Sequence, residues 1–210
     1  PFISMHPGFC LMGAWERSRK SIQDFYPGVT SYPALEDVLK DDAVDLIIVN
    51  TPTYTHFDYA KKALLANKHV IVEKAFTTTV AEAIELKELA AKQNKKIAVF
   101  QNRRWDSDFK TIQQILKEGL LGDINEAEIH FDRYNLSLSP KQHKELAGPG
   151  AGILKDLGPH IIDQALCLFG TPQSVFADIR ITRADSQVDD WFDIILFYPT
   201  FRVRLKAGFI

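Results

Sequence analysis

Short apolar runs alternate with amphipathic segments along the N-terminal half of the chain. Runs of aliphatic and β-branched residues at 44–49 and 69–72 predict buried parallel strands. The segments between them carry apolar residues at helical spacing. Strands are expected at 9–15, 44–49, 69–72 and 96–100, and helices at 18–27, 34–40, 54–66 and 80–94. This alternation predicts an α/β fold with a Rossmann-type, doubly wound parallel sheet.

The pattern changes after Gln101. Apolar and polar residues alternate over 125–134, which is typical of a strand with one face in water. Helices are expected at 106–118 and 159–169, and further alternating strands at 174–183, 191–198 and 202–209. Runs of strands of this kind predict an α+β unit with an open antiparallel sheet. We therefore expect two domains, an α/β domain at 1–101 and an α+β domain at 102–210.

The strand expected at 191–198 is apolar on both faces. The helix at 159–169 can cover one face, and an apolar patch of sheet size is unusual on the surface of a monomer. We therefore expect a homo-oligomer, a dimer or tetramer, that forms through this sheet. The alternative is that chain beyond Ile210 covers the face. Basic residues of the last strand are expected to cross it and to pair with nearby acids: Arg202, Arg204 and Lys206 with Asp189, Asp190 or Asp193.

Composition narrows the classes of partner. A net charge of −2 gives no electrostatic case for nucleic acid or an anionic membrane, and no apolar run approaches the roughly 20 residues of a membrane helix. No signal peptide is visible, and Cys10 and Cys167 lie in apolar segments. Buried free thiols in a reducing compartment are expected, and hence a cytoplasmic location. No metal site is expected, because Glu128, His130 and Asp132 have no further clustered His or Cys nearby.

Polar residues follow the expected strands at their carboxyl ends, where ligands bind in open α/β sheets. Glu73 and Lys74 end the strand at 69–72, and Glu16 and Arg17 end the first strand. Further candidates follow the other two strands: Asn50, Thr51, Pro52 and His56 after one, and Arg104 and Trp105 after the other. From the local pattern alone, surface ion pairs, helix caps and a solvated turn remain open as structural alternatives.

Asp156 and His160 flank the start of the helix at 159–169. Pro159 suits a first helical position, and His160 falls in the first turn. The positive end of a helix disfavours imidazolium, so His160 is expected to be neutral and able to accept a proton. Asp156 is expected to cap the helix or to orient His160. A purely structural His–Asp pair is the alternative.

Taken together, these stretches resemble the Gfo/Idh/MocA family of sugar and polyol dehydrogenases. The resemblance lies in VDLIIVNTPTYTHFDYAKKALLANKHVIVEKAF, QNRRWDSDF and GILKDLGPHIIDQALCLFG, in the family's order and spacing. The family's D-x-G-x-H motif is intact at Asp156, Gly158 and His160. Its E-K-P motif appears as Glu73, Lys74 and Ala75, which keeps the lysine.

The resemblance implies hydride transfer between NAD or NADP and a hydroxyl-bearing carbon of a sugar or polyol. It implies that 1–101 is the dinucleotide-binding domain and that 102–210 is the substrate and oligomerisation domain. It implies that His160 is the acid–base group, that Lys74 stabilises the reacting oxygen, and that Asp156 orients the substrate. The expected cofactor contacts are Glu16, Arg17, Asn50, Thr51, Pro52, His56, Glu73, Lys74, Arg104 and Trp105. The expected substrate contacts are Lys74, Tyr134, Asp156 and His160.

The family's opening strand and Gly-rich phosphate loop do not appear in these 210 residues, and its second sheet continues past Ile210. We therefore expect the sequence to be part of a longer protein. Glu16 disfavours the 2′-phosphate of NADP, whereas Arg17 and Arg19 can bind one, so the choice of cofactor stays open. The alternative function is a nicotinamide-binding regulator without turnover. Retention of Lys74 and His160 favours the enzyme.

Overall fold

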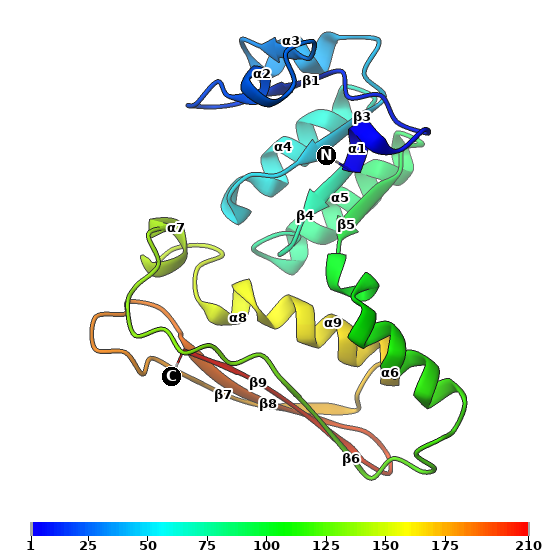
Figure 1. Ribbon diagram of the computed structural model, residues 1–210, viewed down its shortest axis with the longest axis vertical. Coiled ribbons are helices and arrows are strands. Elements are labelled where there is room, and N and C mark those ends of the chain that lie inside the picture. Colours follow the sequence, from blue (N-terminus) through cyan, green and yellow to red (C-terminus); the bar gives the residue numbers. More distant parts are fainter. Residues whose placement is uncertain (1, 210) are drawn as a thin grey trace.

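The computed structural model describes residues 2–209 and consists of two layered halves stacked end to end (Figure 1). The N-terminal half runs from α1 (Phe2–Met5) to β5 (Ile97–Phe100), and the C-terminal half runs from η2 (Asn102–Trp105) to β9 (Arg202–Gly208). Within the described residues, no helix is both long and apolar enough to cross a membrane.

The parallel strands of the N-terminal half form two separate sheets. Strands β1 (Gly13–Trp15) and β2 (Thr30–Tyr32) make one pair, and β3 (Leu46–Val49), β4 (His69–Glu73) and β5 make the other sheet, with β4 in the centre. Parallel α/β architecture is therefore confirmed, but a single continuous sheet is not observed. The order matches the 3-2-1-4-5-6 pattern of dinucleotide-binding sheets, except that no strand among residues 2–209 occupies the central position between β1 and β3.

Helices α4 (His56–Leu65) and α5 (Val80–Lys92) pack against one face of the three-stranded sheet. Thr79 and Glu82 explain where α5 begins: Glu82 N donates to Thr79 Oγ1 at 3.2 Å, and Thr79 N donates to Glu82 Oε2 at 3.0 Å. The buried face joins Ala60, Ala63, Leu64, Leu86 and Ala90 to Val49, Val70 and Val72. This packing fixes β4, the strand that ends at Glu73 and Lys74.

The first predicted strand is shorter than expected. Only Gly13–Trp15 is a strand, and Phe9 is 51% exposed, because β1 pairs with β2 alone. The sequence pattern did not reveal β2, which has three residues. Helices α2 (Ile22–Phe25) and α3 (Leu35–Lys40) complete this region.

The C-terminal half contains a four-stranded mixed sheet in the order β6-β9-β8-β7. Strands β7 (Ser174–Arg180), β8 (Trp191–Phe197) and β9 are antiparallel as expected, but β6 (Glu126–His130) runs parallel to β9. The expectation of a wholly antiparallel sheet was therefore wrong. A parallel pair needs a long crossover, and the segment that contains α7 (Gln142–Glu145), α8 (Ile153–Asp156) and α9 (Gly158–Phe169) supplies it.

Helices α8 and α9 cover one face of this sheet, and α6 (Ser107–Lys117) lies beside α9 (Figure 1). The opposite face carries ion pairs between strands, and apolar residues stay exposed near the β7 edge: Phe176 is 57% and Phe197 is 38% exposed. Arg204 pairs with Asp193, as expected. Lys206 lies opposite Asp193 in the register of β8 and β9 and its charge helps to lower the pKa of Asp193, although no direct ion pair forms. The pairings expected for Arg202, Asp189 and Asp190 were wrong: Arg202 pairs with Glu126, Asp189 binds the first turn of α8, and Asp190 binds Arg183.

Cys10 and Cys167 are free thiols, but both are exposed. The expectation that they are buried was wrong. Cys10 precedes the short strand β1 rather than lying within it, and Cys167 lies on a face of α9 that the sheet does not cover.

Candidate active site

Lys74 follows the central strand of the three-stranded sheet. Val70 and Val72, at 1% and 0% exposure, anchor β4 in the core, so its carboxyl end is rigidly placed. Next to the end of β4, the buried side chain of His56, which is 1% exposed, links two backbone segments by hydrogen bonds. His56 Nδ1 lies 2.8 Å from Ala75 O, and Nε2 lies 2.8 Å from Thr51 O. The segment that carries Lys74 is thereby fixed to the end of β3.

Asp156 and His160 come from the C-terminal half. Asp156 is the last residue of α8, and His160 lies in the first turn of α9. Asp189 holds the start of α8, since its backbone oxygen accepts from Ile153 N at 2.8 Å and its Oδ2 accepts from Leu154 N at 2.7 Å. Helix packing on the sheet therefore determines where both site residues lie.

The two halves meet at an ion pair between Lys74 and Asp156. Lys74 Nζ donates to Asp156 O at 2.7 Å and to Asp156 Oδ1 at 2.9 Å, across a sequence separation of 82 residues. Lys144 Nζ also donates to Asp156 Oδ1, at 2.7 Å. Burial raises the pKa of Asp156, but Lys144 and Lys74 outweigh this effect and lower the pKa to about 2. Asp156 is therefore ionised at neutral pH.

His160 is neutral at neutral pH. Burial, followed by the charges of Lys74 and Arg103, lowers its pKa to about 4. The expected neutral imidazole agrees with this value, although burial rather than the helix dipole is the main cause. His160 stacks on Phe131, with ring centroids 6.5 Å apart, and Asp156 does not hydrogen-bond to it. Asp156 therefore faces the two lysines rather than orienting the imidazole.

Three buried polar atoms near this cluster lack a hydrogen-bond partner among the described residues: Gln101 Oε1, Arg103 Nε and His160 Nδ1. Gln101 and Arg103 follow β5, the neighbour of β4, and Arg103 packs over the same Phe131 ring as His160, 4.8 Å from its centroid. Buried polar groups normally find a partner in protein, water or ligand. These three atoms are therefore open to hydrogen bonds from water or a polar ligand.

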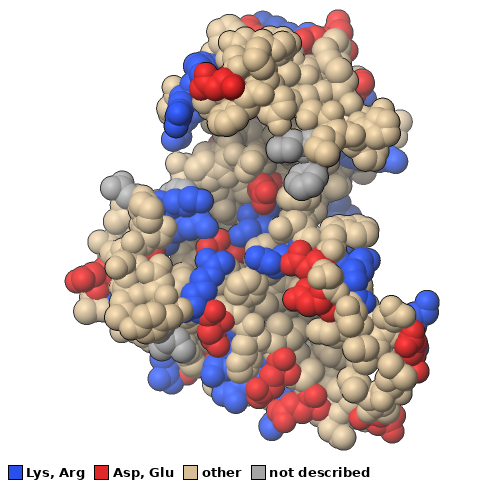
Figure 2. Space-filling view, viewed as in Figure 1, with Lys and Arg blue, Asp and Glu red and all other residues tan. Residues whose placement is uncertain are grey.

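A cavity of about 190 Å³ opens beside Asp156 in the C-terminal half, and it is lined mainly by polar residues. Its lining includes Arg133, Asn135, Lys141, Lys144, Asp156 and Arg183. Figure 2 shows Lys and Arg side chains gathered across the middle of the displayed face, at the level between the two halves.

Glu16 and Arg17 lie at the end of β1, apart from this cluster. Glu16 accepts from Ser21 N at 2.8 Å, from Ile22 N at 2.9 Å and from Ser21 Oγ at 2.9 Å, so its carboxylate binds the start of α2. These bonds, with that of Ile22 foremost, lower its pKa. The structure thus gives Glu16 the capping role that the sequence left open. Arg17 and Arg19 are exposed and have no hydrogen-bond or ion-pair partner within residues 2–209.

The candidates after β3 and β4 share one edge of the sheet. Asn50 is exposed, whereas Thr51 and Pro52 are half-buried at the end of β3, next to the end of β4. Glu73 Oε2 accepts from Lys74 N at 3.1 Å. His56 was expected at the cofactor, but it is buried and both ring nitrogens face backbone oxygens, so the structure gives it a supporting place instead.

The remaining candidates lie further out. Arg104 makes two hydrogen bonds to Asp163, at 2.7 and 2.6 Å, so its guanidinium joins η2 to α9 rather than facing a ligand. Trp105 is 74% exposed, and Lys110 Nζ lies 4.5 Å from its ring centroid. Tyr134 is 85% exposed and does not line the cavity, although its two chain neighbours do. In extended chain, alternate side chains point to opposite sides, which accounts for this difference.

The sequence analysis did not identify Lys144. It lies in a polar segment with glycine and proline, where no periodicity marks a residue as inward-facing. Only the folded chain shows that this segment returns to Asp156.

A parallel α/β half joined to a mixed-sheet half, with Lys, Asp and His at their junction, defines a nucleotide-binding oxidoreductase fold. The chain belongs to the Gfo/Idh/MocA family: residues 1–101 match its oxidoreductase family with an NAD-binding Rossmann fold, and 109–210 match its C-terminal domain.

Three similar proteins illustrate this membership. The uncharacterized oxidoreductase YdgJ of Escherichia coli is 42% identical over 207 residues, 99% of this chain and 60% of that protein. The scyllo-inositol 2-dehydrogenase (NADP(+)) IolW of Bacillus subtilis is 37% identical over 194 residues, 92% of this chain and 54% of that protein. The crystal structure of an oxidoreductase from Bacillus cereus matches with a TM-score of 0.90 and 32% identity, covering 100% of this chain and 60% of that one. The chain thus spans about 60% of the length of YdgJ.

Proposed function

We propose that this protein transfers a hydride between a nicotinamide cofactor and a hydroxyl-bearing carbon of a sugar or polyol. One observation carries the proposal: Lys74 from the parallel sheet and Asp156 from the other half meet at 2.9 Å, beside a neutral His160. An ammonium, a carboxylate and a neutral imidazole at the carboxyl end of a parallel sheet are suited to alcohol oxidation and carbonyl reduction.

The three side chains divide the proton chemistry among them. Neutral His160 can take the proton of the reacting hydroxyl through a ring nitrogen, and return it in the reverse direction. Lys74 holds positive charge where negative charge develops on the reacting oxygen. Asp156, which stays ionised, accepts a hydrogen bond from a neighbouring substrate hydroxyl and fixes the orientation of the ring. When bound, the nicotinamide supplies the carbon that accepts or returns the hydride.

We propose that the cofactor lies along the carboxyl ends of β1, β3, β4 and β5. Asn50, Thr51, Pro52, Glu73 and Lys74 would contact it there, with Trp105 at the rim. At the end of β1, the carboxylate of Glu16 accepts hydrogen bonds from the start of α2, whereas Arg17 and Arg19 make no hydrogen bond or ion pair with any other residue of 2–209. Free guanidinium groups at this place suit the 2′-phosphate of NADP, so we infer a preference for NADP. The name of IolW, which includes NADP(+), supports this preference.

A polar cavity of about 190 Å³ beside Asp156 supports a hydroxyl-rich substrate. Asp156 lines this cavity, whereas Lys74 and His160 do not, so the cavity supports the polarity of the substrate rather than its identity. Two relatives carry names of hydroxyl-rich substrates: scyllo-inositol 2-dehydrogenase, and the glucose-6-phosphate 3-dehydrogenase of Bacillus subtilis, which is 27% identical over 198 residues. We therefore place cyclic polyols and sugars first among the candidate substrates.

Oligomer formation through the C-terminal sheet remains part of the proposal. The sheet face opposite α9 has no covering element within residues 2–209, and Phe176 on this face is 57% exposed. Light scattering on the full-length protein tests it: a dimer or tetramer is expected at micromolar concentration, and a strict monomer would contradict it.

The proposed activity is tested by following the absorbance of reduced nicotinamide. Full-length protein is mixed with NAD or NADP and a panel of inositols, hexoses and sugar phosphates. We expect turnover with at least one cyclic polyol or sugar, faster with NADP. Measurable cofactor binding without turnover on any panel member would instead favour the regulator.

A further inference from the structure

A second lysine, Lys144, binds the carboxylate at the junction of the two halves. Lys144 Nζ donates to Asp156 Oδ1 at 2.7 Å, whereas Lys74 divides its bonds between Oδ1 and the backbone oxygen of Asp156. Both ion pairs are partly buried, with the Asp156 side chain 19% exposed. Oδ1 therefore has two ammonium donors, and no described residue hydrogen-bonds to Oδ2.

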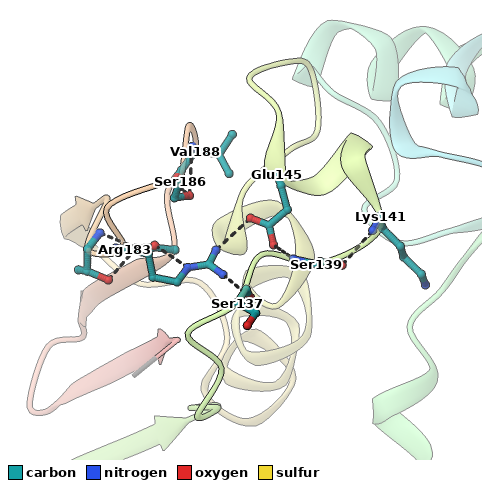
Figure 3. Close-up of polar contacts among 9 residues, drawn as sticks. Ser137, Ser139, Lys141, Glu145, Arg183, Ser186 and Val188 are labelled. Atoms are coloured by element: carbon teal, nitrogen blue, oxygen red, sulfur yellow. Dashed lines mark hydrogen bonds and ion pairs between the residues drawn. The ribbon is translucent and has the colours of Figure 1, made fainter.

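The helical turn that carries Lys144 is anchored by its neighbour Glu145. Glu145 Oε1 accepts from Ser139 N at 2.7 Å, and Oε2 accepts from Arg183 Nη2 at 3.0 Å (Figure 3). Arg183 Nε in turn donates to Asp190 Oδ2 at 2.9 Å, and its Nη1 donates to Ser137 O at 3.1 Å. Glu145, Arg183 and Asp190 are 7%, 9% and 0% exposed. A buried network thus fixes α7 to the chain between β7 and β8.

A second anchor joins Lys144 to the helix that carries Asp156. Gly152 N, at the start of α8, donates to Lys144 O at 3.2 Å. Gly152 has φ +90°, and a Cβ at this position would lie 2.0 Å from Asp189 Oδ1. Only glycine fits here, since Asp189 must approach closely to bind Leu154 N. The backbone of Lys144 is therefore held independently of its side-chain contact with Asp156.

We propose that Lys144 is a positioning residue of the active site, held by the Asp190–Arg183–Glu145 network so that it shares Oδ1 of Asp156 with Lys74. Sharing Oδ1 turns the carboxylate so that Oδ2 stays free for a substrate hydroxyl. It also leaves Lys74 less dependent on Asp156 and available to the reacting oxygen. The titratable groups that face Asp156 are Lys74 from the end of β4, Lys144 from α7 and His160 from α9.

The first test is kinetic and rests on the proposed function. We compare Lys144→Met, Lys144→Arg and the control Lys155→Met, an exposed lysine next to Asp156 that neither lines this cavity nor hydrogen-bonds to Asp156. Loss of one charge-assisted hydrogen bond predicts a fall in kcat/KM of roughly 10- to 100-fold for Lys144→Met, mostly in KM. Lys144→Arg recovers most of this loss, and Lys155→Met stays within about twofold of wild type. Equal behaviour of Lys144→Met and Lys155→Met would overturn the proposal.

The second test does not depend on turnover. The carboxyl carbon of Asp156 is titrated by NMR in the full-length protein and assigned with Asp156→Asn. We expect a higher Asp156 pKa in Lys144→Met than in wild type, and little change in Lys155→Met, because Lys144 and Lys74 are the lysines that lower this pKa. An unchanged pKa in Lys144→Met, in a variant that melts like wild type, would show that Lys144 does not act on Asp156. A wild type without turnover would count against the proposed function only.

Discussion

Two strand ends in the N-terminal half both carry charged residues, but they differ in where the partners come from. At the end of β4, Lys74 binds Asp156, which lies 82 residues further along the chain. At the end of β1, Glu16 binds Ser21 and Ile22, five and six residues away. A local partner satisfies a carboxylate without bringing any other part of the molecule to it. A partner from the other half brings distant parts of the chain together, and on this difference rests our proposal that Lys74 and Asp156 act in catalysis whereas Glu16 caps a helix.

The strongest test of this contrast is Lys74→Met. Removal of the ammonium removes stabilisation of the reacting oxygen, and we expect kcat/KM to fall roughly 10³-fold while the cofactor still binds. Folding should be preserved, because Asp156 keeps its bond to Lys144. Steady-state kinetics and cofactor titration measure the two effects. Retention of more than about a tenth of wild-type kcat would contradict a role for Lys74 in the reaction.

His160→Asn is expected to have the next largest effect. Loss of the acid–base group predicts a fall in kcat of roughly 10²-fold. The pKa of His160 is lowered from 6.5 to about 4, so between these pH values the unfolded chain binds more protons than the folded chain. The His160 contribution to the free energy of unfolding is therefore complete above pH 6.5 and is lost as pH falls toward 4.

Urea unfolding of wild type and His160→Asn across this window measures that contribution. The free energy of unfolding of wild type, minus that of His160→Asn, should decrease as pH falls from 6.5 toward 4. A difference that stays constant with pH would mean that His160 is not held neutral. Asp156 loses its own contribution to the free energy of unfolding in a lower pH range, between 3.8 and about 2. The contributions of His160 and Asp156 can therefore be measured separately.

Arg17→Ala and Arg19→Ala together should have a moderate effect that is specific to one cofactor. If these free guanidinium groups bind the 2′-phosphate, KM for NADP rises roughly tenfold while KM for NAD changes little. Competition of the two cofactors in one assay measures the preference. A parallel loss with both cofactors would show that the arginines do not recognise the phosphate.

Glu16→Gln is expected to have the smallest effect. Glutamine keeps an acceptor for the amides of Ser21 and Ile22, so KM for either cofactor should stay within about twofold of wild type. A selective loss of NAD binding in this variant would show that Glu16 holds the ribose, and the contrast between the two strand ends would then fail.

Much of the framework could be predicted from the sequence. Runs such as 44–49 and 69–72 identify β3 and β4, because continuous aliphatic runs favour parallel strands. The expectation that these strands are buried holds for β4 better than for β3, where Ile48 is 43% exposed because α4 and α5 cover one face of the sheet. The direction of β6 could not be predicted, since alternation at Glu126–His130 is the same in parallel and antiparallel pairs. Strand β2 was missed because three residues show no period.

Among the residues of the candidate site, some could be identified from the sequence pattern and others could not. Lys74, Asp156 and His160 stand at strand and helix ends, where position itself indicates chemistry. Lys144 stands in an irregular segment, and its contact with Asp156 depends on the buried bonds among Glu145, Arg183 and Asp190. Such a network is a property of the packed chain. Arg104 shows the converse limit of the sequence pattern: it follows a strand, but its partner Asp163 on α9 is visible only in the folded chain.

The central claim is that the Lys74–Asp156–His160 junction directs hydride transfer to a nicotinamide. The most direct measurement uses full-length protein, oxidised NADP and cyclic polyols deuterated at their carbinol carbons, with NMR detection of the reduced cofactor. We predict deuterium on the reduced nicotinamide ring in wild type and none above background in Lys74→Met. Tight NADP binding by wild type, with no deuterium transferred from any polyol or sugar tested, would contradict the account.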